Sequence, residues 1–213
     1  MIPKLIHHIW IGTKPFPEEF SDFVSKWKIL YPDFNFIFWD NNLVNESKII
    51  DESISEYYYG DYKIAFKVDL LRFKILERYG GLYVDTDTEP LKRMPDEFFE
   101  LNFFSGREKP QPQVAIGIMG SEVKNQLVND YNTNVLHNVK QNLSTGIENV
   151  AKITGPEYFD TLCTKYITTS GYKFFDSNYF YPYGWNELHR RYENFKETCP
   201  DAYSVHHWAH SWW

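Results

Sequence analysis

The stretch Arg78-Tyr-Gly-Gly-Leu-Tyr-Val-Asp-Thr-Asp-Thr-Glu89 decides how this chain folds, because it contains an apolar strand followed by two carboxylates spaced one residue apart. Side chains of a strand alternate between the two faces of a sheet, so we expect Tyr83, Asp85 and Asp87 to share one face. Two carboxylates this close repel each other unless a cation lies between them, and hard oxygen ligands favour Mg²⁺ or Mn²⁺. A solvated acidic turn is the competing interpretation, because Asp-x-Asp is a short pattern that is common by chance.

The segment directly upstream, residues 62–79, has apolar residues at helical spacing and is followed by Gly80-Gly81, which predicts a helix that ends there. A second apolar row flanks the first, so most of the helix surface should be covered. Asp69 and Arg72 are charged residues within this apolar helix, and a buried charge needs a partner. Either they pair with each other across one turn, or they bind a polar ligand such as a sugar at the end of the adjacent strand.

Strand and helix patterns alternate along residues 1–90, with strands at 5–12, at 35–39 and up to Asp87, and helices at 18–31, 43–50 and 62–79. This alternation predicts a Rossmann-like α/β fold, in which a mostly parallel sheet is flanked by helices. Ligands of such sheets bind at the carboxyl ends of the strands. Gly12, Trp39-Asp40 and Asp85-Thr-Asp87 all follow strands, so they should meet at one rim. Further strands are expected near 102–106 and 113–119, and further helices near 123–137 and 156–167.

Two more blocks accompany this stretch and the charged helix, in an order that is typical of a known family. The four blocks are Ile2-Pro-Lys-Leu-Ile-His-His-Ile-Trp-Ile-Gly12, Asp69-Leu-Leu-Arg72, Tyr79-Gly-Gly-Leu-Tyr-Val-Asp-Thr-Asp87 and His206-His-Trp-Ala-His-Ser-Trp212. With them the chain resembles glycosyltransferase family 32, the retaining sugar transferases with a DXD sugar-binding motif. More distantly, it is similar to the glucosylating domain of large clostridial toxins. The resemblance implies one GT-A-type domain over residues 1–213, with a nucleotide-binding half at about 1–90 and an acceptor half at about 91–213.

The resemblance also implies roles for individual residues. Trp10 would stack on the nucleobase of the donor, although a strand tryptophan is commonly part of the core. Asp69 and Arg72 would bind hydroxyls of the donor sugar, and the planar fork of Arg72 also suits phosphate. The implied catalytic set is Asp69, Arg72, Asp85 and Asp87, and Tyr83 joins Trp10, Asp69 and Arg72 among the donor-binding residues.

A metal site follows from the same resemblance. Asp85 and Asp87 would hold Mn²⁺ or Mg²⁺, with Asp87 the more direct ligand, and the imidazole of His206 would complete the coordination. The choice among His206, His207 and His210 stays open. In an extended segment His206 and His210 share one face and His207 lies on the other.

The implied reaction is the transfer of a hexose from a sugar nucleotide, with a UDP-sugar favoured, to a glycan or lipid-linked saccharide in surface polysaccharide synthesis. A divalent ion would neutralise the charge that builds on the leaving diphosphate, over which Ser211 and Trp212 would close. The resemblance implies retention of the anomeric configuration. Because no residue stands out as a nucleophile, we favour a front-face reaction in which a donor phosphate oxygen takes the acceptor proton.

Two other functions remain open at this point. Asp85-Thr-Asp-Thr88 fits the Asp-x-Asp-x-Thr start of haloacid-dehalogenase-like phosphatases, in which the first aspartate, here Asp85, is phosphorylated. Against this, more than 80 residues precede the motif, and Glu89-Pro90 follows it in place of a small hydroxyl residue and an aliphatic one. The other alternative is a non-catalytic module that binds sugar nucleotides or glycans. Steady release of nucleotide would identify the transferase, and a covalent aspartyl phosphate would identify the phosphatase.

Composition sets outer bounds on the function. The chain has 213 residues without a linker or internal repeat, which favours one domain. Its net charge of −7 and scattered basic residues argue against nucleic-acid binding. Two lone cysteines, no signal peptide and no run of about 20 apolar residues predict a cytoplasmic protein. Peripheral attachment at the inner face of the membrane is the alternative location, for which residues 189–196 mix basic and aromatic side chains.

Overall fold

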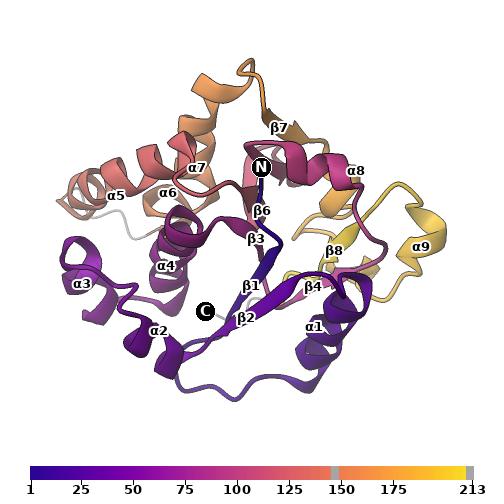
Figure 1. The fold of residues 1–213 in the computed structure, drawn as a ribbon, viewed down its shortest axis with the longest axis horizontal. Helices are drawn as coiled ribbons and strands as arrows, with labels where there is room; N and C mark the ends of the chain where they lie inside the picture. Colours follow the sequence, from indigo (N-terminus) through magenta and orange to yellow (C-terminus); the bar gives the residue numbers. More distant parts are fainter. Residues whose placement is uncertain (145–148, 210–213) are drawn as a thin grey trace.

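A computed structural model describes residues 1–144 and 149–209 of the chain, and its centre is a six-stranded sheet with the strand order β2-β1-β3-β6-β5-β7 (Figure 1). β1 is parallel to both β2 and β3, as the alternation of strands and helices predicted. β6 is antiparallel to β3 and β5, while β7 is parallel to β5. The strands are β1 Leu5–Ile9, β2 Asn35–Trp39, β3 Gly81–Val84, β5 Phe103–Arg107, β6 Val114–Ser121 and β7 Tyr172–Phe175.

Helices cover both faces of this sheet. On one side lie α2 to α7, and on the other lie α1, α8 and α9 together with a small antiparallel sheet of β4 and β8 (Figure 1). The helices are α1 Glu18–Leu30, α2 Asn41–Ser47, α3 Glu52–Tyr59, α4 Ile64–Tyr79, α5 Gln126–Ser144, α6 Val150–Ile153, α7 Pro156–Cys163, α8 Ser177–Phe180 and α9 Phe195–Thr198. Short 3₁₀ turns occur at Asp96–Glu100, Thr164–Tyr166 and Leu188–Arg190, and the small sheet pairs β4 Thr88–Pro90 with β8 Ser204–His206.

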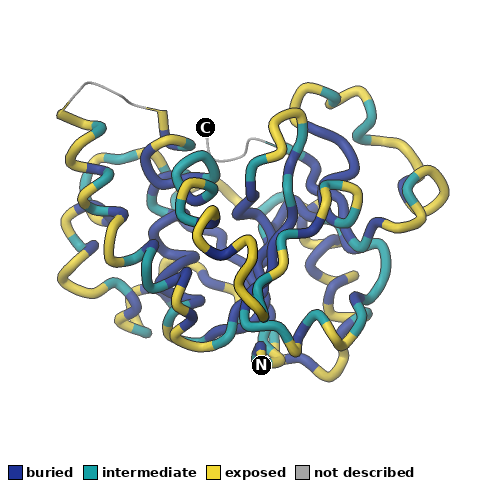
Figure 2. The backbone as a smooth tube through the Cα atoms, turned by 90° about the horizontal axis from the view of Figure 1, so that it is seen from above, coloured by how far each residue is buried: buried dark blue, intermediate teal, exposed yellow. Residues whose placement is uncertain are grey.

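Each face of the sheet has its own apolar core. Within β3, Leu82 and Val84 pack on the side of α1, whereas Tyr83 packs on the side of α4. This is the alternation expected of a strand whose two faces are both covered. Figure 2 shows the result, with the central strands buried and the exposed residues on the outer helices, turns and loops. Within the described part of the chain, no helix is long and apolar enough to cross a membrane.

The strand that carries the paired carboxylates is shorter than predicted. It ends at Val84 and not at Asp87, because the N–H of Thr88 donates to the carbonyl of Asp85 at 3.0 Å and closes a turn. The chain then leaves the main sheet, and β4 pairs with β8. Asp85 and Asp87 therefore lie in a tight turn, and the expectation that they share a strand face is wrong. The helix before the strand ends as predicted, at Tyr79, with Gly80 and Gly81 at positive φ.

Other boundaries also differ from the sequence-based expectations. The first strand ends at Ile9 and not at Gly12, and the helix expected at 43–50 occupies 41–47 instead. Asp40 explains the earlier start, because its side chain accepts a hydrogen bond from the N–H of Leu43 and caps the helix. Seven elements had no counterpart in the expectations, namely α3, α6, α8, α9, β4, β7 and β8.

Two histidines of β1 are completely buried in the neutral state. His7 donates from Nε2 to the carbonyl of Gly80 at 2.9 Å, and its Nδ1 accepts from the indole of Trp39 at 3.2 Å. His8 donates from Nδ1 to the carbonyl of Val84 at 2.9 Å. Burial lowers the pKa of both histidines from 6.5 to about 4. A second proton on the ring of His7, at Nδ1, would point at the N–H of Trp39 and lose that hydrogen bond. The hydrogen bonds of His7 therefore favour its neutral form, as burial does.

We expect acid to destabilise the fold through this pair. Below pH 6.5 the unfolded chain binds protons that the folded chain does not bind until about pH 4, so stability is lost as the pH falls through this window. Between pH 7 and pH 5 the two sites together should lower the free energy of unfolding by about 4 kcal/mol. Urea unfolding at both pH values measures this loss. His8→Gln should remove about half of it, whereas the exposed His189→Gln should not change it. An equal loss in His8→Gln and in the parent would contradict the assignment, because groups with a raised pKa, such as Asp69 and His206, also change stability in this window but do so in both proteins.

Candidate active site

The carboxyl ends of β1, β2 and β3 meet at one rim of the sheet, as the sequence predicted. The N–H of Trp10 donates to the carbonyl of Trp39 at 2.9 Å, and the side chain of Asn41 accepts from the N–H of Gly12 at 3.0 Å. Next to them, the N–H of Asp85 donates to the carbonyl of Gly117 at 2.7 Å. The rim therefore brings together the ends of three strands and the turn that carries the two aspartates.

A cluster of two carboxylates and one imidazole occupies this turn. Asp85, Asp87 and His206 each offer a ligand atom, and these atoms lie within 4.8 Å of one another. His206 Nε2 is 3.2 Å from Asp87 Oδ1 and 3.5 Å from Asp85 Oδ2. The pairing of Thr88 with His206 in the small sheet explains how residues so distant in sequence meet. Carboxylate oxygens and an imidazole suit Mn²⁺ or Mg²⁺, so the cluster is able to hold a divalent cation.

The charges of this cluster are strongly coupled. Burial would raise the pKa of Asp87, but the neighbouring His206 and the N–H of Ala209 hold it well below its usual value. Burial would lower the pKa of His206, but the carboxylates of Asp87 and Asp85 raise it to about 10. The buried Nδ1 of His206 has no hydrogen-bond partner within the described residues. The pair of acids therefore attracts a positive charge at this point, which is the electrostatic requirement of a cation site.

Asp69 and Arg72 are buried on α4 and reach the same cluster. Arg72 lies 3.3 Å from Asp69 Oδ1 and 3.3 Å from Asp85 Oδ1, and its Nη1 donates to the carbonyl of Ile116 at 2.8 Å. Thr154 donates to the other oxygen of Asp69 at 2.9 Å. Burial raises the pKa of Asp69 to about 6, against the lowering effect of Arg72. The two residues do pair, as one of the sequence alternatives held, and Arg72 also joins their helix to the cluster of Asp85, Asp87 and His206.

Tyr83 lies on the same side as Asp85, as the sequence predicted, but it is fully buried. Its side chain has no exposed surface, its hydroxyl donates to Asp85 Oδ1 at 2.5 Å, and the guanidinium of Arg72 lies 4.7 Å from its ring centre. The core of the sheet encloses the ring, and the contact of Tyr83 with a donor stays a prediction. Tyr83 fixes the orientation of the Asp85 carboxylate from behind.

The other residues predicted for the site are either buried, outside the cluster of Asp85, Asp87 and His206, or outside the described residues. Trp10 is 7% exposed, makes edge contacts with Phe16 and Phe20, and donates to the carbonyl of Lys14 at 2.9 Å. Its stacking on a nucleobase stays a prediction. His207 donates to Glu89 at 3.1 Å and lies outside the metal cluster, so His206 is the described histidine beside the aspartates. The predictions for three further residues fall outside the described residues, namely His210, Ser211 and Trp212.

A cavity of about 200 Å³ adjoins the cluster and is lined by Asp69, Arg72, Asp85 and His206. The lining also contains residues to which the sequence analysis assigned no role, among them Glu108, Gly117 and Tyr181. Of these, Gly117 had a usable signal, because a glycine inside an apolar strand often marks a close approach of another group. A methyl group there would lie 2.9 Å from Asp85 Oδ2 and 3.1 Å from the Tyr181 hydroxyl.

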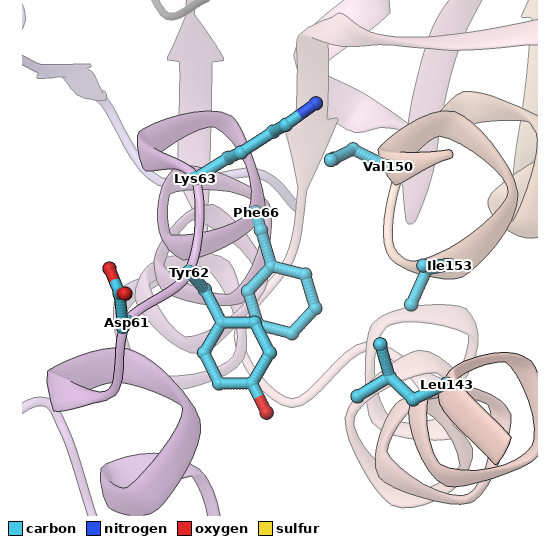
Figure 3. A pocket seen from close by; sticks show the side chains of 7 residues that line it. All are labelled: Asp61, Tyr62, Lys63, Phe66, Leu143, Val150 and Ile153. Atoms are coloured by element: carbon cyan, nitrogen blue, oxygen red, sulfur yellow. The ribbon is translucent and has the colours of Figure 1, made fainter. Parts of the chain in front are cut away.

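A second cavity of about 290 Å³ lies beside the first and shares Val150 with it. Figure 3 shows its two walls, with the rings of Tyr62 and Phe66 on one side and aliphatic side chains of α5 and α6 on the other. This cavity is the larger one, but its lining is mainly apolar and contains none of the clustered aspartates or histidines. The chemistry of the site therefore belongs to the first cavity.

Comparisons with known proteins agree with this geometry. Residues 17–104 match the family described as the glycosyltransferase sugar-binding region containing a DXD motif. An uncharacterized glycosyltransferase of Acanthamoeba polyphaga mimivirus, L373, is 31% identical over 226 residues, which cover 100% of this chain and 84% of that protein. The mannosyl phosphorylinositol ceramide synthase SUR1 of Saccharomyces cerevisiae is 30% identical over 124 residues. That match covers 57% of this chain and 31% of SUR1.

Solved structures support the same fold. The PaToxG glycosyltransferase aligns with a TM-score of 0.63 and 23% identity, over 78% of this chain and 70% of that one. The catalytic domain of the alpha-toxin from Clostridium novyi aligns with a TM-score of 0.55 and 12% identity, over 79% and 64% of the two chains. The GT-A fold and the distant likeness to clostridial toxins, both expected from the sequence, are confirmed. With a full-length relative, a matching family and the DXD turn in place, the chain belongs to the glycosyltransferases whose sugar-binding region contains a DXD motif.

Proposed function

We propose that this glycosyltransferase is metal-dependent, takes a hexose from a sugar nucleotide, with a UDP-sugar favoured, and retains the anomeric configuration. The observation that carries the proposal is the meeting of Asp85, Asp87 and His206 beside a cavity that also contains Asp69 and Arg72. In this account residues 1–90 form the nucleotide-binding half and residues 91–213 the acceptor half of one domain.

Asp85, Asp87 and His206 would hold Mn²⁺ or Mg²⁺. Such an ion supplies a Lewis acid that neutralises negative charge on the leaving diphosphate. The protein contributes fixed geometry, because Tyr83 and Arg72 both bind the carboxylate of Asp85 and so limit its movement. Catalytic groups that are already oriented avoid the cost of reorganisation during the reaction.

Donor binding falls to side chains on α4 and at the rim. The fork of Arg72 is held by the carbonyl of Ile116 and by two carboxylates, so it presents a fixed cation to the sugar or the phosphate. Asp69 is an acceptor for sugar hydroxyls, and Thr154 orients it. In this proposal Trp10 contacts the nucleobase, and Ser211 and Trp212 close over the diphosphate.

For the acceptor we propose a glycan or a lipid-linked saccharide, as in surface polysaccharide synthesis. The acceptor hydroxyl attacks the anomeric carbon, the nucleoside diphosphate leaves, and a phosphate oxygen of the donor takes the hydroxyl proton on the same face. A lipid-linked acceptor is supported by the name of the yeast relative, a mannosyl phosphorylinositol ceramide synthase. The mainly apolar second cavity, which shares Val150 with the donor cavity, offers room for an apolar part of such a molecule. Peripheral contact with a membrane follows from this choice of acceptor.

A panel of sugar nucleotides tests the proposed function. Thermal unfolding is measured with UDP-hexoses and GDP-hexoses, each with Mn²⁺ and with excess chelator. We expect one sugar nucleotide to raise the melting temperature in Mn²⁺ and to lose this effect in chelator, since a ligand that binds the folded state stabilises it. Absence of any Mn²⁺-dependent stabilisation across the panel would contradict the proposal.

Neighbouring histidines provide a matched test of the metal site. His206→Ala should weaken Mn²⁺ binding roughly 10- to 100-fold, the range typical of changes around metal ligands. His207→Ala removes the next imidazole, which bonds Glu89 and lies outside the cluster, so Mn²⁺ affinity should stay within about twofold of the parent. Calorimetric titration with Mn²⁺ measures both affinities. Equal weakening in the two variants would show that position 206 has no special role.

Gly117→Ala should damage the site while leaving the core intact. The added methyl would press on Asp85, whose carboxylate cannot yield freely because Tyr83 and Arg72 hold it. A displacement of this kind should lower sugar transfer on the order of 10- to 100-fold. Urea unfolding accompanies the rate measurement, and Gly120→Ala, whose methyl would meet Phe104 in the core, is the contrasting variant that should lose stability first. Full activity of Gly117→Ala would contradict the placement of Asp85.

A further inference from the structure

The cavity beside Asp85 and His206 is also lined by a further carboxylate, that of Glu108. Glu108 follows β5 directly, and its backbone N–H donates to the carbonyl of Gln113 across the turn to β6 at 3.0 Å. The residue is 8% exposed and lines the same cavity as Asp69, Arg72 and Asp85. Those three come from α4 and from the turn after β3, so Glu108 approaches the cavity from a different element.

The carboxyl group of Glu108 is only partly satisfied. The side-chain amide of Gln113 donates to Oε1, and within the described residues no hydrogen bond to Oε2 and no ion pair of Glu108 is found. Burial raises the pKa of this carboxyl, with Glu157 and Asp160 acting in the same direction and Gln113 and His206 opposing them. Glu108 Oε2 is not among the fully buried atoms without a partner, so it is accessible from the cavity, where a ligand is able to supply a donor.

A hydrogen-bond donor lines the same cavity. The hydroxyl of Tyr181 accepts from the N–H of Ile118 at 3.0 Å, which leaves its own proton available to donate. Gly117 lies between this hydroxyl and Asp85, and its missing side chain keeps the space open. An acceptor from Glu108 and a donor from Tyr181 match a ligand whose hydroxyl groups both donate and accept, which is the chemistry of a hexose ring.

We propose that Glu108 binds a hydroxyl group of the transferred sugar and thereby sets which hexose the enzyme accepts. This inference rests on the proposed function, because it assigns a role within the same donor cavity. Asp69 and Arg72 contact the sugar from α4, and Glu108 contacts another part of the ring from the β5–β6 turn. A sugar that lacks the matching hydroxyl leaves the buried carboxyl unpaired, and sites of this kind discriminate strongly against such analogues.

The first test separates the sugar from the nucleotide. In Glu108→Gln, the Gln113 amide should hold the new side-chain oxygen and turn the new amide nitrogen toward the cavity, so an acceptor becomes a donor. We expect the affinity for the best UDP-hexose of the panel to fall roughly 10- to 100-fold in Mn²⁺, with the affinity for UDP unchanged. Glu157→Gln, which removes a nearby charge outside the cavity lining, is the matched control and should bind both ligands like the parent.

The second test identifies the hydroxyl. Nucleotide release is measured with singly deoxygenated versions of the same donor for the parent and for Glu108→Gln. With the intact donor, kcat/KM should be higher for the parent than for Glu108→Gln. With the donor that lacks the hydroxyl bound by Glu108, the two proteins should have equal kcat/KM, because neither is then able to make that hydrogen bond. Glu108→Asp keeps the charge and serves as the second variant if the glutamine protein melts early.

Two results would overturn the inference. One is a loss of affinity in Glu108→Gln that is equal for UDP and UDP-hexose, or a loss of kcat/KM that is equal for every deoxy donor. Either would mean that Glu108 only supports the structure. The other is no loss at all. Failure of the proposed function looks different, because then the parent protein itself would bind sugar nucleotides no better than the nucleotide alone and would release nothing.

Discussion

Replacing Asp87 by Asn is expected to lower sugar transfer by more than about 100-fold, because it removes leaving-group stabilisation worth several kcal/mol. The amide has the size of the carboxylate and is able to keep the hydrogen bond from the N–H of Ala209. It lacks the charge that faces His206 at 3.2 Å and that a divalent cation requires. The loss should therefore appear in catalysis and in Mn²⁺ binding together, with unfolding still cooperative.

The measurement is nucleotide release at saturating donor and Mn²⁺, with circular dichroism to verify the fold. Asp201→Asn is the matched control, since Asp201 is exposed and lies outside the metal cluster. That protein should turn over at the parental rate. Near-parental turnover of Asp87→Asn would remove Asp87 from the proposed metal site.

Arg72→Lys is expected to be nearly as damaging, although it keeps the charge. The guanidinium bonds the carbonyl of Ile116, pairs with Asp69 and Asp85, and lies over the ring of Tyr83. One ammonium group is unable to satisfy all of these contacts, so we expect a loss of kcat/KM on the order of 100-fold. Arg78→Lys on the same helix is the control, because Arg78 is exposed, contacts two backbone carbonyls and the ring of Tyr79, and pairs with no carboxylate in the described part of the chain; its replacement should be nearly neutral.

A double replacement decides whether Arg72 and Asp69 act on the ligand or only on each other. If their mutual pairing were the whole role, changing both to leucine would restore activity, because apolar residues often replace a buried ion pair without loss of stability. Arg72 also contacts Asp85, so we expect the double variant to stay inactive while remaining folded. Restored transfer would reduce the pair to a structural ion pair.

The fold of residues 1–90 was largely predictable, because its signals are local. The apolar periodicity of residues 62–79 and Gly80-Gly81 predicted α4 and its end, and the alternation of patterns predicted the parallel pairing of β1 with β2 and β3. Parallel strands place their carboxyl ends at one edge, so the position of Asp85 and Asp87 at that rim followed from topology. The resemblance then supplied His206, which no local pattern distinguishes from His207.

The rest of the site depends on contacts that no local pattern reveals. β3 stops at Val84 because the chain turns there and its next residues pair with a strand more than a hundred residues later. The alternating pattern continues through Asp87, so it predicted a strand that was too long. The burial of Tyr83 depends on the helices that cover the sheet, and propensity carries no information about it. Glu108 is an ordinary glutamate in the sequence, and only the packing of the β5–β6 turn brings it into the cavity that Asp69, Arg72 and Asp85 line.

Metal-dependent sugar transfer is tested most simply by the steady-state release of nucleotide from the sugar nucleotide that binds best. The release is measured in Mn²⁺ and then in excess chelator. We predict continuous turnover in Mn²⁺, faster when an acceptor saccharide is added, and loss of at least about 100-fold in chelator that is reversed by added metal. Turnover that is unchanged in chelator, or a single burst that leaves phosphate covalently bound to Asp85, would contradict the account of Asp85, Asp87 and His206 as a metal site for sugar transfer.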